Sequence, residues 1–217
     1  MTQQERFIED LKWNQLMVAV RTATPEDAYQ AAAACVESGI RFIEITFTVP
    51  GAAEVMQRLS KDERVVVGAG TILSVDDAKT ALAAGASYLV SPHLDEAVVQ
   101  FAKKEGVVSI PGASTPTEIY RAYKAGGDII KLFPFVELGG LAFLKAVRGP
   151  LPFVKYMLCG GANLDNVSAY LAADAAGILI GTAIIRRELV AKKDWKAIAG
   201  LAGSFVRKAE EFAGTKV

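Results

Sequence analysis

The stretch Ile129-Ile-Lys-Leu-Phe133 places a single lysine among apolar residues, with a proline directly after it. Such a run is typical of a strand in a parallel sheet that is covered on both faces. An ammonium group inside such a strand is costly, and burial favours the neutral amine that a Schiff-base nucleophile requires. The alternative is that the stem of Lys131 is buried while its ammonium group reaches solvent.

Seven further apolar runs, with helical patterns between them, repeat this arrangement along the chain. They are Leu16–Val20, Phe42–Phe47, Val65–Val67, Tyr88–Val90, Val107–Ile110, Phe153–Leu158 and Ile178–Ile180. Helix starts, each a capping residue with an acid three positions on, stand at Thr24-Pro25-Glu26-Asp27, Ser74-Val-Asp-Asp77 and Thr115-Pro116-Thr117-Glu118. Eight alternating strands and helices predict an α/β fold, a (β/α)8 TIM barrel, with an open doubly wound sheet as the alternative. Residues 1–14 predict an N-terminal helix, and Trp195–Phe212 predicts a closing helix.

Length and composition limit the possible function classes. A chain of 217 residues, 52% of them hydrophobic, can bury one sizeable core, so we expect one domain over residues 1–217. Lysine plus arginine equals aspartate plus glutamate at 24 each, which argues against nucleic acid or an anionic membrane as a partner. Two cysteines cannot form a disulfide framework, and residues 1–14 hold no apolar stretch long enough for a signal peptide. We therefore expect a cytoplasmic protein that binds its partner at a local site.

Two ionisable residues are predicted to enter the barrel interior. Alternation along Phe42–Phe47 places Glu44 on the face that points away from the helices, and the same parity along Ile129–Phe133 places Lys131 there. A carboxylate and an amine are each costly inside a barrel and tolerable as neighbours. A structural ion pair and a catalytic pair both explain this placement.

Small and polar residues at the strand ends favour catalysis over a plain ion pair. They are Gly68-Ala-Gly-Thr71, Ser91-Pro92-His93 and Pro111-Gly112. In a barrel the active site lies at the carboxyl ends of the strands. The glycines allow close approach of backbone or ligand, and Thr71 can donate a hydrogen bond to a carboxylate or a carbonyl.

A second group of residues predicts an anion site. Cys159-Gly160-Gly161 and Gly181-Thr182 follow the last two predicted strands, and these loops are the usual phosphate position in barrels. Backbone amides freed by glycines, at helix N-termini, bind anions. A tight turn alone would explain Gly160-Gly161, but the two pairs together favour phosphate.

Other polar residues give weaker signals. His93 is the one histidine, and without a partner acid or metal-ligand spacing we interpret it as a rim residue. Cys159 has no histidine in its segment to activate it, so we interpret it as a small lining residue. Arg21 can bind a carboxylate or phosphate, or form a salt bridge at the rim. We find no metal cluster and no dinucleotide fingerprint, and we predict that neither a metal nor an organic cofactor is needed.

These motifs give the chain a resemblance, over nearly its whole length, to the class I aldolases of 2-keto-3-deoxy-6-phosphogluconate (KDPG) and 4-hydroxy-2-oxoglutarate (KHG). The resemblance is carried by Glu44-Ile-Thr-Phe-Thr-Val-Pro50, Gly68-Ala-Gly-Thr71, Ser91-Pro92-His93, Pro111-Gly112 with Thr115-Pro116-Thr117-Glu118, Lys131-Leu-Phe-Pro134 and Gly160-Gly161. Several motifs in a fixed order are far more specific than any one of them. Family members commonly form homotrimers.

The resemblance implies a metal-independent reaction on a 2-keto-3-deoxy sugar acid. Lys131 would attack the C2 ketone and form an imine, and Glu44 would move protons as the C3–C4 bond breaks. The protonated imine would accept the electron pair as an enamine of pyruvate.

The resemblance also implies which residues bind the rest of the substrate. Thr71 would contact the pyruvyl carboxylate, with Pro92 and Phe133 as walls of the pyruvyl end. The residues implied for the phosphate are Gly160, Gly161, Gly181 and Thr182.

Two departures from the family pattern affect substrate binding. Many relatives carry an arginine where this chain has Thr48, so we expect Arg21 to take more of the carboxylate binding. The family's Pro-Thr-Gly-Gly is here Leu158-Cys159-Gly160-Gly161, and the Cys159 thiol replaces a hydroxyl that would contact the hydroxyl-bearing part of the substrate.

The leading hypothesis is a lyase that splits KDPG into pyruvate and glyceraldehyde 3-phosphate. One alternative keeps this chemistry and changes the substrate to the galactonate epimer or to KHG. Another is a phosphosugar-binding barrel that acts as an isomerase or epimerase, with Lys131 as an acid or base and no imine. A third is a non-catalytic binding protein or a structural trimer.

Overall fold

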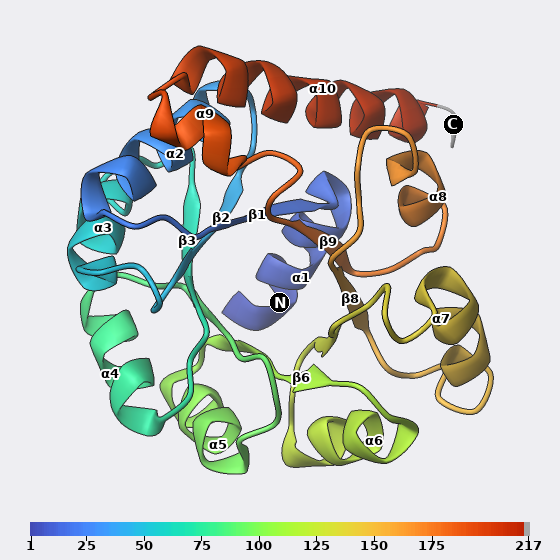
Figure 1. The fold of residues 1–217 in the computed structure, drawn as a ribbon. Helices are drawn as coiled ribbons and strands as arrows, with labels where there is room; N and C mark the ends of the chain where they lie inside the picture. The colour runs from blue at the N-terminus through green and yellow to red at the C-terminus, as the bar shows by residue number, and fades with distance from the viewer. Residues whose placement is uncertain (215–217) are drawn as a thin grey trace.

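Parallel strands form a barrel inside a ring of helices in the computed structural model, which describes residues 1–214 (Figure 1). The strands are β1 Leu16–Val20, β2 Phe42–Thr46, β3 Val66–Gly70, β4 Tyr88–Val90, β5 Val108–Ile110, β6 Gly112–Ala113, β7 Ile130–Leu132, β8 Tyr156–Cys159 and β9 Gly177–Ile180. Their order in the sheet is β5-β4-β3-β2-β1-β9-β8-β7-β6. Sequential strands are neighbours throughout, as the alternation of strands and helices predicts.

The barrel closes because β5 and β6 are two parts of one chain segment with Pro111 between them. The Lys131 amide of β7 donates to the Pro111 carbonyl at 2.9 Å, and the Asp128 amide donates to the Ser109 carbonyl at 3.0 Å. These bonds link the two ends of the sheet order. The predicted (β/α)8 barrel is confirmed, and the open doubly wound sheet is wrong.

The eight predicted strands are all present, and two of their boundaries move by several residues. The run at Val65–Val67 continues as β3 to Gly70, because the ladder with β2 continues and pairs Thr46 with Gly70. The strand expected over Phe153–Leu158 begins only at Tyr156. The Val154 amide donates to the Leu151 carbonyl at 3.3 Å, which holds the preceding residues in a turn.

The three helix starts predicted from capping residues are all present. The helices are α1 Gln3–Asn14, α2 Pro25–Glu37, α3 Ala52–Leu59, α4 Val75–Ala83, α5 Glu96–Glu105, α6 Pro116–Ala125, α7 Gly140–Arg148, α8 Val167–Leu171, α9 Arg187–Ala191 and α10 Trp195–Gly214. Thr24, Ser74 and Thr115 each accept a hydrogen bond from the amide three residues on, as predicted. Within residues 1–214, none of the helices combines the length and the apolar character needed to cross a membrane.

Two hydrophobic clusters hold the fold together. The larger cluster lies between the strands and the surrounding helices, and the smaller one fills the barrel interior. Helix α1 closes one end of the barrel, and Figure 1 shows it across the centre of the ring. Its Phe7 ring contacts Phe42 at 5.2 Å and Tyr88 at 5.1 Å between ring centroids. The end that receives the carboxyl termini of the strands is left to form a site.

Candidate active site

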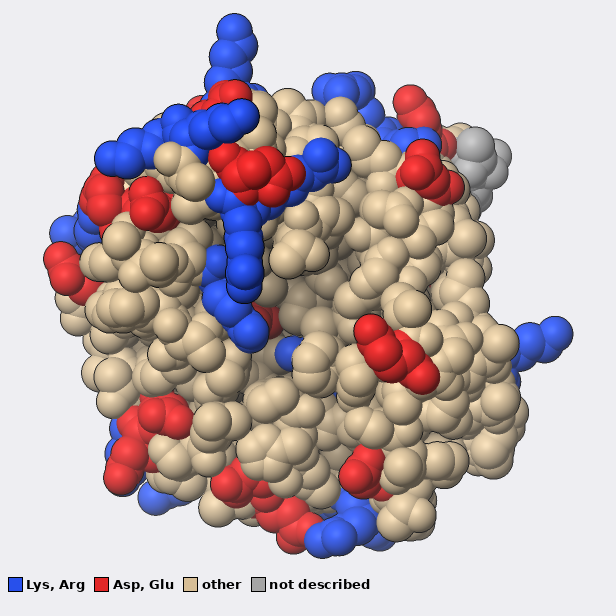
Figure 2. Space-filling view, in the orientation of Figure 1, with Lys and Arg blue, Asp and Glu red and all other residues tan. Residues whose placement is uncertain are grey.

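A cavity of about 460 Å³ opens at the carboxyl ends of the strands. Figure 2 shows a hollow in the middle of this face, with lysine and arginine atoms along one side and small acidic and basic areas inside it. The predicted site residues that line the cavity are Arg21, Glu44, Thr71, Pro92, Lys131, Phe133, Cys159, Gly160, Gly161, Gly181 and Thr182. The sequence therefore located the cavity and most of its wall, while the roles of these residues stay predictions.

Lys131 lies in the middle of β7 and enters the cavity from the barrel wall. Only 6% of the residue is exposed, which argues against a lysine whose ammonium group extends into bulk solvent. Its Nζ lies 4.9 Å from the centre of the Phe133 ring, a distance at which an ammonium group is attracted by the ring face. The amine is thus held inside the cavity by the strand and by an aromatic wall.

Glu44 lies on β2, between β1 and β3, and is 2% exposed. Burial raises the pKa of its carboxyl group, and the positive charges of Lys131 and Arg21 partly oppose this rise. Among residues 1–214, its Oε2 atom has no hydrogen-bond partner, and no ion pair within 4.0 Å joins Glu44 to Lys131. A direct structural ion pair therefore does not describe the two groups, which share one cavity without touching.

Glycines on β3 make room for the carboxylate. A side-chain carbon at Gly70 would collide with the Glu44 carboxyl group, and one at Gly68 would collide with the Tyr88 ring. Thr71 follows with a φ of 60°, a left-handed conformation that is strained for a β-branched residue. Strain of this kind is found at functional sites. Thr71 lies on the cavity wall in this conformation.

Thr48, the first of the two departures from the family pattern, lies outside the cavity wall. It is exposed, and its hydroxyl lies 2.8 Å from that of Thr46, which does line the cavity. Thr46 also donates to the Val20 carbonyl at 3.2 Å. Thr48 is thus one hydrogen bond removed from the cavity, whereas Arg21 stands at the cavity itself.

Cys159 ends β8 beside Lys131 and Glu44. Burial raises the pKa of its thiol to about 11, and the nearby charge of Lys131 opposes the rise. The group is therefore a neutral thiol at physiological pH and a poor nucleophile. This agrees with the interpretation of Cys159 as a lining residue.

The predicted anion loops come together, but without the expected helix N-termini. Gly160 and Gly161 have φ of 107° and 76°, and their carbonyls accept from the Tyr170 hydroxyl at 3.3 Å and the Asn166 side-chain amide at 2.9 Å. Gly181 and Thr182 lie on the same cavity wall. Helix α8 begins only at Val167 and α9 only at Arg187, and each is one short turn. The prediction of helix N-termini was wrong, because both loops continue through turns first.

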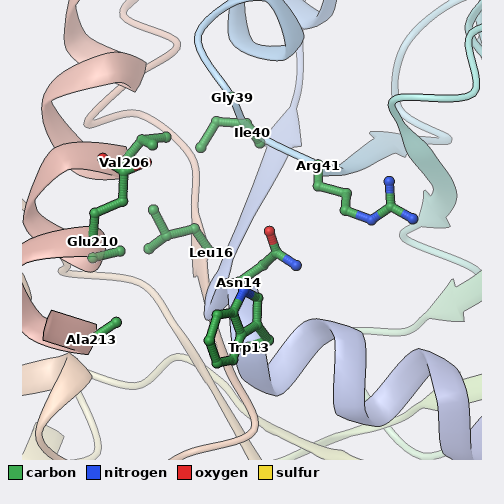
Figure 3. Close-up of a pocket in the computed structure, with 10 residues that line it drawn as sticks. Trp13, Asn14, Leu16, Gly39, Ile40, Arg41, Val206, Glu210 and Ala213 are labelled. Atoms are coloured by element: carbon green, nitrogen blue, oxygen red, sulfur yellow. The ribbon is translucent and has the colours of Figure 1, made fainter. Parts of the chain in front are cut away.

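Two other hollows differ from this one in chemistry. His93 lines a neighbouring hollow of about 440 Å³ and is exposed, as expected for a rim residue. A hollow of about 290 Å³ lies at the opposite end of the barrel, beside α1 and α10 (Figure 3). There the Arg41 side chain points away from Val206 and Glu210, and it donates to Asp10 at 2.7 Å. Neither hollow brings a buried amine and a buried carboxylate together.

Two polar residues of the barrel interior were not among the predicted site residues. Thr46 lines the cavity, and the alternation that points Glu44 inward points Thr46 inward as well. Tyr88 is fully buried, and its hydroxyl has no partner among residues 1–214. Because Tyr88 opens a strand of three residues, the alternation is too short to indicate its direction. Within the same residues, no cluster of three or more His, Cys, Asp or Glu side chains is placed to hold a metal ion.

Comparison with known proteins agrees with this geometry. A family model described as KDPG and KHG aldolase matches residues 7–201. A 2-dehydro-3-deoxy-phosphogluconate aldolase of Treponema pallidum is 34% identical over 90% of this chain and 93% of its own length. One of Pseudomonas aeruginosa is 33% identical over 81% of this chain and 80% of its own length.

Solved structures agree as well. The KDPG aldolase of Legionella pneumophila, with pyruvate captured as a covalent carbinolamine intermediate, matches with a TM-score of 0.83 and 27% identity, over 91% of this chain and 97% of that one. The family model covers most of the barrel, and the cavity holds the motifs on which the resemblance rests. The chain belongs to the KDPG and KHG aldolase family.

Proposed function

We propose that this chain is a class I aldolase that cleaves KDPG into pyruvate and glyceraldehyde 3-phosphate. The observation that carries the proposal is one buried amine, Lys131, and one buried carboxylate, Glu44, in a single cavity at the strand ends. The same cavity holds the glycine loops that suit a phosphate. The relatives from T. pallidum and P. aeruginosa bear the name of this activity.

The first half of the proposed reaction forms an imine on Lys131. The neutral amine attacks the C2 carbonyl carbon, and a proton passes from the nitrogen to the carbonyl oxygen, which gives a carbinolamine. Glu44, whose pKa is raised by burial, then protonates the carbinolamine hydroxyl, which leaves as water. The carbinolamine captured in the Legionella enzyme is the intermediate that this step requires.

The second half breaks the carbon–carbon bond. The Glu44 carboxylate takes the proton of the C4 hydroxyl while the C3–C4 electron pair moves into the protonated imine. Glyceraldehyde 3-phosphate leaves, and an enamine of pyruvate stays on Lys131. Glu44 returns its proton to C3. Water then adds to the protonated imine, pyruvate leaves, and the released proton goes to the Glu44 carboxylate, which restores the acid and the neutral amine. Because the imine serves as the electron sink, the chain needs neither a metal nor an organic cofactor.

The two ends of the cavity would bind different parts of the substrate. At the pyruvyl end, Arg21 and Thr71 would bind the carboxylate, with Pro92 and Phe133 as walls. At the other end, the loops at Gly160 and Gly181 would bind the phosphate through backbone amides. The residues assigned to this end are Gly160, Gly161, Gly181 and Thr182. Thr48 would act through Thr46, to which its hydroxyl is bonded.

The phosphate loops favour KDPG or its galactonate epimer over KHG, which has no phosphate. A phosphorylated substrate uses both ends of the cavity, whereas KHG leaves the Gly160 loop without a partner. The family description includes both KDPG and KHG, so the choice needs a direct measurement. We propose comparing pyruvate release from KDPG, the galactonate epimer and KHG. Equal kcat/KM for phosphorylated and unphosphorylated substrates would remove the role of the phosphate loops.

Trapping of the imine tests the chemistry itself. The protein is incubated with pyruvate, reduced with borohydride, and digested for peptide mass mapping. We expect the mass of one reduced pyruvate on the peptide that contains Lys131. A matched control is Lys104→Ala, on the exposed face of α5, which should trap pyruvate as the wild type does. A folded wild-type protein without an adduct would refute the Schiff base and favour an isomerase or epimerase.

The proposal extends to the oligomeric state, the location and the pathway of the protein. We propose a homotrimer in the cytoplasm that serves the Entner–Doudoroff breakdown of sugar acids. Exposed aromatic side chains, among them the contacting pair Tyr123 and Phe153, are compatible with such assembly. The molar mass in solution, measured by light scattering after size exclusion, tests the trimer, and a monomer at micromolar concentration would contradict it.

A further inference from the structure

Tyr88 places a hydroxyl inside the barrel, close to the site. It is the first residue of β4, it is fully buried, and its ring packs against Phe7 of α1 and tilts toward Phe42. Its hydroxyl has no hydrogen-bond partner among residues 1–214. A buried polar group without a partner is unusual and costly, so this hydroxyl calls for an explanation.

The Oε2 atom of Glu44 is the other buried side-chain oxygen without a partner in the same residues. The ring of Tyr88 occupies the space over Gly68, and the Glu44 carboxyl group occupies the space over Gly70. These glycines lie two residues apart on the inward face of β3, about 6.6 Å along the strand. Burial raises the pKa of Tyr88, and the negative charge of Glu44 raises it further, as expected of neighbours.

The two unpaired atoms are complementary in chemistry. A phenol supplies one donor hydrogen, and an ionised carboxylate only accepts. A water molecule has the size and the hydrogen-bonding capacity to join two polar groups that do not touch. Burial keeps the pKa of Tyr88 well above 10.0, so the phenol stays a donor over the whole working range of an enzyme.

We propose that Tyr88 is a positioning residue for Glu44: its hydroxyl donates a hydrogen bond to the Glu44 carboxylate from the barrel interior, through one bound water. This inference rests on the proposed aldolase function, because it assigns Tyr88 to the proton-transfer group of that reaction. The bond favours the ionised form of Glu44 and fixes the direction of its second oxygen. Glu44 then presents its other oxygen to the substrate.

The remaining ionisable groups around Glu44 approach it from the open end. Lys131 on β7 and Arg21 after β1 supply positive charge, and Cys159 on β8 supplies a neutral thiol. Lys131 is consumed as an imine during the reaction, and Arg21 is expected to bind the substrate carboxylate. Tyr88 is therefore the partner that stays with Glu44 through every step.

The variant Tyr88→Phe tests this role, since it removes the hydroxyl and keeps the ring. We expect kcat for KDPG cleavage to fall about five- to tenfold at neutral pH, with KM within about twofold. Loss of a donor to the carboxylate raises the pKa of Glu44, so the acidic limb of the kcat/KM profile should move up by about one pH unit. The melting temperature should fall by no more than about 4 °C, because one hydrogen bond is lost while the ring over Gly68 is kept.

Two further variants separate positioning from a packing effect. Tyr156→Phe removes a hydroxyl that donates to the Leu151 carbonyl outside the barrel interior, and its pH profile should match the wild type. In a Glu44→Gln background, Tyr88→Phe should cause no further loss of kcat, because the two residues act as one unit. An unmoved acidic limb in Tyr88→Phe, or additive losses in the double variant, would overturn the proposal. Absence of pyruvate trapping in the wild type would instead refute the aldolase function.

Discussion

The two ends of the cavity are built from different kinds of structure. The end with Lys131 and Glu44 lies on strands that are paired on both sides, and these two residues are 6% and 2% exposed. The end with Gly160 and Gly161 lies on a loop of exposed residues with positive φ. Proton transfer and imine formation need fixed geometry, which buried strands provide, and burial there raises the pKa of Glu44. Phosphate binding needs amides at the right places, which loops provide without buried charge.

Removal of the Lys131 amine should cause the largest loss of activity. Lys131→Ala eliminates the covalent step, so kcat for KDPG cleavage should fall on the order of 10⁴-fold or more. The fold should persist, because an apolar side chain is no burden in this position. Circular dichroism checks folding, and pyruvate release measured with lactate dehydrogenase checks activity. Full activity in Lys131→Ala would refute the assignment of the nucleophile.

Loss of the charge at Glu44 should lower activity and raise stability together. Glu44→Gln should reduce kcat on the order of 10²- to 10³-fold, because general acid–base catalysis is lost. Burial raises the pKa of Glu44, so the folded state binds this proton more tightly than the unfolded chain does. Wild-type stability therefore falls as the pH rises above the unfolded value of 4.5.

The stability advantage of Glu44→Gln should thus grow as the pH rises above 4.5 and then level off above the folded pKa. Melting temperatures of both proteins from pH 4 to pH 8 measure this difference. A gap between the two proteins that shrinks with rising pH would contradict a raised pKa at Glu44.

A methyl group at Gly70 on β3 should displace the Glu44 carboxylate and leave the Lys131 amine in place. Gly70→Ala places a carbon where the Glu44 carboxyl group now lies, so we expect a loss of kcat on the order of 10²-fold. Pyruvate should still reach Lys131, and trapping should be slower but present. Gly200→Ala in α10, where the added carbon meets no atom within 4 Å, serves as the control and should be fully active. Wild-type kcat in Gly70→Ala would show that Glu44 can work from another position.

The residues at the strand end of the site could be predicted from the sequence, because side chains along a strand point alternately to its two faces. Alternation places Glu44 and Lys131 inward, and parallel pairing then brings their strands into one wall. The helix caps at Thr24, Ser74 and Thr115 could be predicted for a similar reason, because each cap depends on residues only three positions apart.

The loop end could be predicted only in part. Glycines at Gly160 and Gly181 located the loops, but α8 and α9 begin later than expected, because turn geometry depends on contacts such as that of Asn166 with Gly161. The position of Thr48 outside the cavity depends on its bond to Thr46, which no local pattern indicates. Tyr88 was missed because its partner space over Gly68 exists only in the assembled barrel.

A methyl group on the phosphate loop should change binding and leave the chemistry intact. Gly160 has a φ of 107°, which is a strained conformation for a residue with a side chain, so Gly160→Ala should shift the loop. The added carbon itself meets no protein atom within 4 Å. For Gly160→Ala we expect KM for KDPG to rise about tenfold, with kcat within about threefold. The rate of pyruvate trapping should be unchanged. Slower trapping would mean that the two ends of the cavity are coupled.

The smallest effect is expected at Cys159, where the two ends meet. Its pKa of about 11 makes it a neutral thiol, and a hydroxyl at this position is a better hydrogen-bonding group. Cys159→Thr should therefore raise kcat/KM about threefold for the substrate whose hydroxyl it reaches, with little change for the others. Comparison of KDPG, its galactonate epimer and KHG identifies that substrate, and Cys35→Ala, buried in α2, controls for loss of a thiol elsewhere. An equal change for all three substrates would mean that Cys159 acts on Lys131, and so on imine formation, rather than on the substrate hydroxyl.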